Sequence, residues 1–129
     1  MDKFTINDKE YTLGELLLSP TRCMVLPIKA LFENGIFPKY IIHNTGGGMC
    51  KINRFIQQDY AEVKLYEQPM PFIFKIMRKF LSIYELENVF NCGRLMELIF
   101  ESDDSVICDV KQIVQGYNVP ISYEGRINF

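Results

Sequence analysis

The chain has 129 residues, 48% of them apolar, with 14 Lys and Arg against 16 Asp and Glu, one His, four Cys and no Trp. A chain of this length can bury roughly two thirds of the surface that it exposes when unfolded, so it needs neither a metal nor disulfides to fold. A net charge of −2 and a pI near 5.4 argue against a nucleic-acid-binding domain, which commonly has a pI above about 9.

The first segment predicts a β-hairpin. Apolar and polar residues alternate over residues 3–6 and 9–12, and Asn7-Asp8 between them is a typical two-residue turn. Thr12 and Glu15 then match a capping box, in which each side chain satisfies a free backbone amide at the start of a helix. We expect that helix to run through Leu18.

Pro27 suits the first turn of a second helix, which runs to Asn34 and is closed by Gly35. The sequence predicts strands over residues 40–43 and 49–52, and we expect them to pair as a hairpin across the loop between them. Alternation over residues 61–66 favours another strand, although these residues could instead extend a preceding helix.

The apolar run over residues 72–81 predicts a helix, because it has helical length and follows Pro71. Its apolar face is wider than packing on one side requires. Ser82 and Glu85 match a second capping box, and residues 95–100 indicate a further helix.

The last segment begins with residues 106–108, a short buried strand or the entry of a helix. A helix of one or two turns is expected over residues 110–115, and a closing hairpin over 119–129 around Glu124-Gly125. Hairpins mixed with unpaired helices indicate the α+β class. We therefore expect a single α+β domain over residues 1–129, with a small antiparallel sheet or hairpins packed with three to five helices.

The four cysteines are widely spaced and form no C-x-x-C pair, so we expect four reduced thiols and no zinc site. No stretch reaches the roughly 20 apolar residues that a membrane-spanning helix needs. The amino terminus lacks the apolar core of a secretory signal. These observations predict a cytoplasmic protein with no metal or cofactor and no contact with a membrane.

The triplet Gly46-Gly47-Gly48 is a possible ligand loop, because consecutive glycines expose backbone amides that can cradle a phosphate or an oxyanion. The spacing fits neither a P-loop nor a dinucleotide-binding fingerprint. His43 and Cys50 flank the triplet and could face one another across the expected hairpin as base and nucleophile. A loop without any ligand is the competing interpretation.

Charge is unevenly distributed along the chain. Residues 1–81 carry 11 bases and 8 acids, whereas residues 82–129 carry 3 bases and 8 acids. Such a block can simply be a solvated surface, but on one face it would attract a basic partner and speed association. The acidic residues concerned are Glu85, Glu87, Glu97, Glu101, Asp103, Asp104 and Asp109. Their spacing does not fit a calcium-binding loop.

The sequence therefore predicts a non-catalytic binding protein of bacterial or phage origin, such as an immunity protein, an antitoxin or another toxin inhibitor. It would be a monomer or weak homodimer that covers a basic protein, for example a nuclease-type toxin, with these acidic residues. One alternative is a small enzyme or ligand-binding domain built around Gly46–Gly48 with His43 and Cys50. Another is a subunit of a larger assembly that docks through the helix over residues 72–81.

Overall fold

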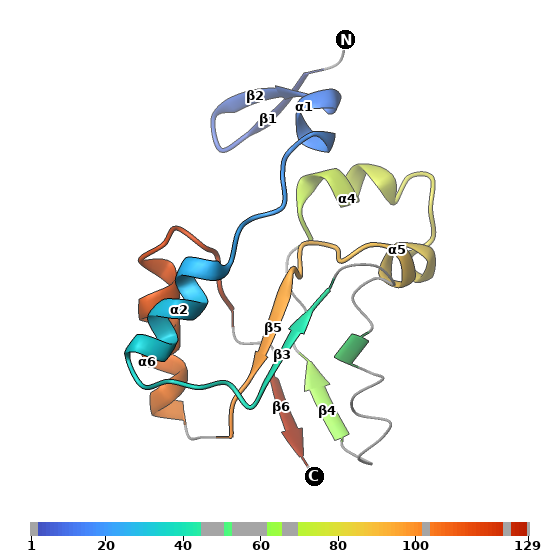
Figure 1. Ribbon diagram of the computed structural model, residues 1–129. Helices are drawn as coiled ribbons and strands as arrows, with labels where there is room; N and C mark the ends of the chain where they lie inside the picture. The colour runs from blue at the N-terminus through green and yellow to red at the C-terminus, as the bar shows by residue number, and fades with distance from the viewer. Residues whose placement is uncertain are drawn as a thin grey trace. The chain divides into compact units, whose positions relative to one another are not determined.

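The computed structural model describes residues 3–44, 51–52, 62–65, 70–101, 104–122 and 125–128 (Figure 1). The chain forms two units, each assembled from three stretches. The first unit comprises Met1–Thr21, Asn44–Lys51 and Pro69–Leu95, and the second comprises Arg22–His43, Ile52–Gln68 and Met96–Phe129. Five helices and three two-stranded antiparallel sheets lie within the described residues, which confirms the α+β class. The single domain expected over residues 1–129 stays a prediction.

In the first unit, the amino-terminal hairpin forms as predicted from β1 (Lys3–Ile6) and β2 (Lys9–Thr12). Asn7 and Asp8 make the turn with φ values of 49° and 62°. These are the left-handed conformations that a tight hairpin turn requires and that Asn and Asp tolerate better than most residues.

Both predicted capping boxes are confirmed. Thr12 caps α1 (Leu13–Leu17): its Oγ1 accepts from the backbone N–H of Glu15, and the Glu15 carboxylate accepts from the backbone N–H of Thr12. Ser82 and Glu85 repeat the arrangement at α5 (Ile83–Val89). Each box satisfies two amides that the first helical turn leaves without an intrahelical acceptor.

The helix after Pro71 is shorter than predicted. α4 (Phe72–Met77) has six residues, and residues 78–80 form turns instead of continuing it. Part of its wide apolar face is used within the first unit, since Phe72 packs against Phe4 with 5.5 Å between ring centroids and Phe74 against Phe90 with 6.0 Å.

In the second unit, α2 (Val25–Glu33) and α6 (Asp104–Gln115) lie side by side (Figure 1). Leu31 from α2 and Val110 and Val114 from α6 form a buried cluster in which no side chain is more than 3% exposed. Pro27 lies in the first turn of α2 and Gly35 follows its end with φ of 72°, as predicted. α6 is longer than predicted and includes residues 106–108.

The strand β3 (Tyr40–His43) is confirmed, but its predicted partner is wrong. β3 pairs with β5 (Met96–Ile99), with Tyr40 opposite Ile99 and His43 opposite Met96. Residues 96–99 are therefore a strand instead of the predicted helix, and Lys51 and Ile52 are helical instead of belonging to a strand. The apolar run around β5 is too short for its periodicity to separate helix from strand, so pairing with a distant strand decided the outcome.

The strand predicted over residues 61–66 is confirmed as β4 (Glu62–Leu65). It pairs with β6 (Gly125–Asn128), with Leu65 opposite Gly125. The hairpin expected over residues 119–129 is wrong, because residues 119–122 form no strand and β6 finds its partner 60 positions earlier. No helix in the described part of the chain combines the length and hydropathy needed to cross a bilayer.

Candidate functional site

His43 is the last residue of β3 and is exposed. The sequence places His43 and Cys50 on opposite strands of one hairpin, whereas the described residues show β3 paired with β5 and Lys51 and Ile52 in a helix. Gly46–Gly48 and Cys50 lie outside the described residues. A ligand-binding or catalytic role for any of these residues stays a prediction.

Asn44 directly follows β3 and is 2% exposed. Its backbone N–H donates to the carbonyl oxygen of Leu95 at 2.8 Å, and its side-chain Nδ2 donates to the carbonyl oxygen of Arg94 at 2.9 Å. Its Oδ1 has no hydrogen-bond partner in the described part of the chain. Two hydrogen bonds thus fix the position of Asn44, two residues before Gly46.

The stretch that receives Asn44 begins with a tight turn from Asn91 to Arg94. The backbone N–H of Arg94 donates to the Asn91 carbonyl at 2.9 Å, and that of Gly93 donates to Asn91 Oδ1 at 3.0 Å. Cys92 and Gly93 have φ values of 51° and 94°. A Cβ on Gly93 would overlap the ring of Pro71, so only glycine lets this turn lie against the N-cap residue of α4. The sequence alone did not predict this turn, although Asn commonly accepts from the backbone N–H two residues later, as Asn91 does here.

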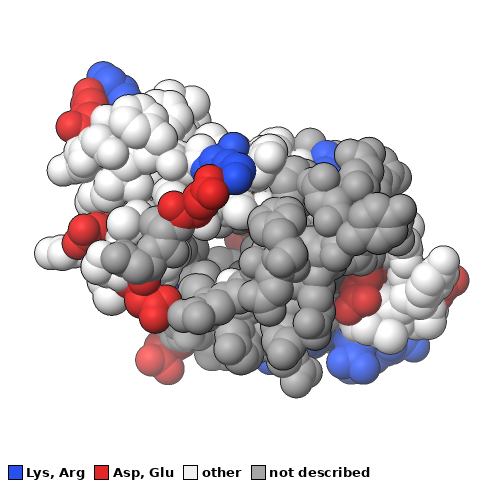
Figure 2. Space-filling view, turned by 90° about the horizontal axis from the view of Figure 1, so that it is seen from below, with Lys and Arg blue, Asp and Glu red and all other residues white. Residues whose placement is uncertain are grey.

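The acidic residues predicted to bind a basic partner are divided between the two units. Glu85 and Glu87 belong to the first unit and the others to the second, while Asp103 lies outside the described residues. Glu97 is 8% exposed in β5, and the assignment of these acidic residues to a binding surface stays a prediction. On the face shown in Figure 2, the acidic side chains of the described residues lie in several small groups, some beside basic side chains.

Two of these acidic groups already have partners. The Lys39 ammonium donates to Glu101 Oε2 at 2.8 Å, which lowers the pKa of Glu101 and raises the pKa of Lys39. The backbone and hydroxyl of Ser82 donate to the Glu85 carboxylate and lower its pKa. These carboxylates therefore have local structural roles.

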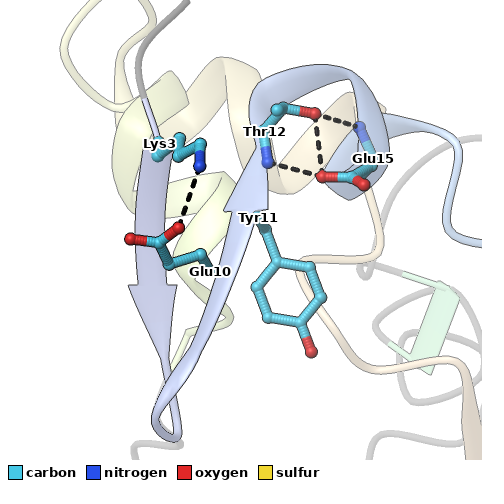
Figure 3. Close-up of a pocket in the computed structure, with 5 residues that line it drawn as sticks. All are labelled: Lys3, Glu10, Tyr11, Thr12 and Glu15. Atoms are coloured by element: carbon cyan, nitrogen blue, oxygen red, sulfur yellow. Dashed lines mark hydrogen bonds and ion pairs between the residues drawn. The ribbon is translucent and has the colours of Figure 1, made fainter.

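A hollow on the amino-terminal hairpin is shown in Figure 3. It is lined by Lys3, Glu10, Tyr11, Thr12 and Glu15. Lys3 Nζ contacts Glu10 Oε2 at 3.0 Å, and Thr12 and Glu15 form the capping box. Four of the five side chains therefore form two pairs. Within the described residues, no group of three or more His, Cys, Asp or Glu side chains could hold a metal ion.

Comparison with known proteins gives relatives that share one description, phosphoribosylformylglycinamidine cyclo-ligase. The protein of Agathobacter rectalis is 39% identical over 101 residues, which cover 72% of this chain and 30% of that protein. That of Burkholderia pseudomallei is 35% identical over 98 residues, covering 73% of this chain and 28% of its own length. That of Methanocaldococcus jannaschii is 31% identical over 131 residues, covering 97% of this chain and 37% of that protein. No family model matches the chain, and no solved structure matches it.

The chain thus spans about a third of the length of the curated relatives it matches. Because these relatives carry the name of an enzyme, the expectation of a non-catalytic immunity protein, antitoxin or toxin inhibitor is wrong. The expectation that the chain is not an enzyme is contradicted by the same relatives. The alternative of an enzyme or ligand-binding domain fits the relatives better. The basic protein partner and the docking helix over residues 72–81 stay predictions.

Proposed function

We propose that this chain has the same function as the corresponding third of a phosphoribosylformylglycinamidine cyclo-ligase. In particular, we propose that it helps to bind the phosphoribosyl substrate that the name of these relatives contains. One observation carries the proposal. The similarity to the Methanocaldococcus jannaschii protein takes in 97% of this chain, so it covers both units and the stretch from His43 to Cys50.

The chemistry of that substrate suits the ligand loop expected from the sequence. A phosphoribosyl group ends in a phosphate, and successive backbone amides of glycines are well suited to hold phosphate oxygens. Gly46–Gly48 supply three such amides, and His43 adds a donor three positions before them. In this proposal His43 and Gly46–Gly48 contact the substrate, and Cys50 lies close to it.

Calorimetric titration tests the proposal. Phosphoribosylformylglycinamidine should bind, and the same compound without its phosphate should bind at least about tenfold more weakly, a loss of about 1.4 kcal/mol. Gly47→Ala should weaken binding of the phosphorylated compound to a similar extent. Gly14→Ala is the matched control, because a Cβ there meets only ordinary contact, 3.9 Å from Thr12 Oγ1. Equal affinity for both compounds, or no binding of either, would contradict the proposal.

We further propose a cytoplasmic location. Cys23 and Cys108 are free thiols, as suits a reducing compartment. Ring closure itself is proposed to require the functions of the other two thirds of the relatives' length, supplied by further polypeptide.

The docking surface over residues 72–81 is a candidate contact for such a partner. Sedimentation at several protein concentrations, with wild type compared with Phe80→Asp, tests whether this surface takes part in association.

A further inference from the structure

We propose that the docking surface at the end of α4 binds an acidic segment of the further polypeptide. The surface consists of three cations, Lys75, Arg78 and Lys79, and the exposed aromatic ring of Phe80. That a further polypeptide exists rests on the proposed function. The acidic character of its docking segment rests on contacts within the first unit.

The first step is that the apolar side chains of α4 are already in use. Phe72 packs against Phe4 with 5.5 Å between ring centroids, and Phe74 packs against Phe90 with 6.0 Å. All four rings belong to the first unit, and both α4 rings are half-buried. The apolar stripe of this helix therefore faces its own unit, and the remaining side of the helix is the one available to a partner.

The second step is the placement of the cations on that remaining side. Lys75, Arg78 and Lys79 are exposed and are spaced i, i+3, i+4, which brings their side chains to one side of a helix. The helical course continues through them, because the backbone N–H of Arg78 donates to the carbonyl of Phe74 at 3.0 Å and that of Lys79 to Ile76 at 3.1 Å. The three positive charges thus form one cluster.

The third step is that this cluster has no internal counter-charge. Within the described residues, no Asp or Glu forms an ion pair with any of the three cations. The next acid along the chain, Glu85, accepts hydrogen bonds from the backbone and hydroxyl of Ser82 instead. Other exposed lysines do have carboxylate partners: Lys3 with Glu10, Lys29 with Glu33 and Lys39 with Glu101.

The fourth step is the aromatic side chain beside the cluster. Phe80 follows Lys79 directly and is 83% exposed. The helix dipole favours cations at the carboxyl end of α4, but it gives no reason to expose a phenyl ring. Aromatic side chains anchor protein interfaces, and charges around them guide association. The segment that fits this surface has carboxylates on either side of an apolar side chain.

An acidic protein segment fits this surface better than other polyanions do. Attachment to anionic lipid commonly uses clusters of about 4–8 Lys and Arg, more than the three present here. The net charge of −2 also disfavours nucleic acid, whose binding depends on neutralising many phosphates.

The test measures binding to overlapping synthetic peptides that cover the Methanocaldococcus jannaschii protein outside its match to this chain. Wild type should bind peptides in which Asp or Glu flank an apolar side chain, and added salt should weaken that binding by screening the charges. The triple variant Lys75→Glu, Arg78→Glu, Lys79→Glu should lose affinity at least about tenfold.

Two matched controls separate this surface from general effects of charge and exposure. Reversal of three other exposed lysines, Lys9, Lys29 and Lys39, changes the net charge equally and should leave affinity within about twofold of wild type. Phe80→Ser should weaken peptide binding, whereas Leu18→Ser, at a side chain 84% exposed in the same unit, should not.

The outcomes keep this proposal apart from the proposed function. If no acidic peptide binds, or if the triple variant binds as well as wild type, the docking proposal is overturned. Tighter binding to phosphatidylserine vesicles than to any peptide would also overturn it, in favour of a membrane surface. If wild type binds acidic peptides but not phosphoribosylformylglycinamidine, only the proposed function fails.

Discussion

At the scale of single residues, Gly93 and Gly35 form an instructive pair. Both have a positive φ, 94° and 72°, which side chains other than glycine adopt at a cost. Their surroundings differ, because a Cβ on Gly93 would overlap Pro71, whereas a Cβ on Gly35 would meet nothing within 4 Å.

Gly93→Ala should therefore destabilise the protein by about 2–5 kcal/mol, the sum of the left-handed backbone cost and overpacking. Gly35→Ala should cost about 1–2 kcal/mol, from the backbone alone. Urea unfolding of both variants measures the difference. Equal losses would mean that Pro71 moves aside without cost.

At the scale of elements, the capping boxes are the features that local sequence specifies most directly. The hydroxyl of Ser82 accepts from the Glu85 backbone N–H, and no other group in the box can replace it. Ser82→Ala should cost about 1 kcal/mol of unfolding free energy, and Thr12→Ala a similar amount at α1. Denaturation at pH 7 checks both, with Ser19→Ala, at an exposed serine outside the helices, as a reference. A loss no larger than that of the reference would refute the role of the cap.

The same box makes stability depend on pH. Because hydrogen bonds from Ser82 hold the pKa of Glu85 below its ordinary value of 4.5, ionised Glu85 favours the folded state. This contribution is fully present above the ordinary pKa and is lost as pH falls through the lowered one. The stability difference between wild type and Glu85→Gln should therefore shrink between about pH 5 and pH 3.

NMR titration gives a direct check of the cause. In Ser82→Ala, the pKa of Glu85 should rise towards its ordinary value, while the pKa of Glu15, lowered by Thr12 at the other box, should not change. An unchanged pKa of Glu85 would show that the serine hydroxyl plays no part in lowering it.

The elements that could be predicted from sequence are those specified by neighbours along the chain. The Asn7-Asp8 turn, both capping boxes and the Gly35 cap depend on interactions within four residues, and each formed as expected. The failures are elements specified by distant partners. The run containing Glu97 became a strand because β3 pairs with it, and nothing in the run itself indicates that pairing.

The same distinction applies to the candidate site. His43 and Gly46–Gly48 could be singled out from residue type alone, since glycine amides and imidazole have recognisable chemistry. The hydrogen bonds of Asn44 could not be predicted, because its acceptors are the backbone carbonyls of Arg94 and Leu95, 50 and 51 positions away, and every residue carries such a carbonyl.

At the scale of the whole molecule, Leu31 is among the largest side chains that are fully buried within the described residues. The Leu31 side chain is 0% exposed and packs in one buried cluster with Val110 and Val114. Leu31→Ala should cost about 2–5 kcal/mol through lost burial and the cavity left behind. Val25→Ala, on the same helix but 67% exposed, should stay within about 0.5 kcal/mol of wild type. Thermal and urea unfolding compare them, and similar losses would show that Leu31 is not part of a packed core.

The pairing of β4 with β6 has a consequence for biosynthesis. Their facing residues Leu65 and Gly125 are separated by 60 positions. At a translation rate of about 5–20 residues per second, β4 is complete roughly 3–12 s before its partner has been made. Throughout that interval the nascent chain presents an unpaired strand edge, a template for pairing with other chains. The yield of folded protein should therefore depend on whether a chaperone covers that edge until β6 emerges from the ribosome.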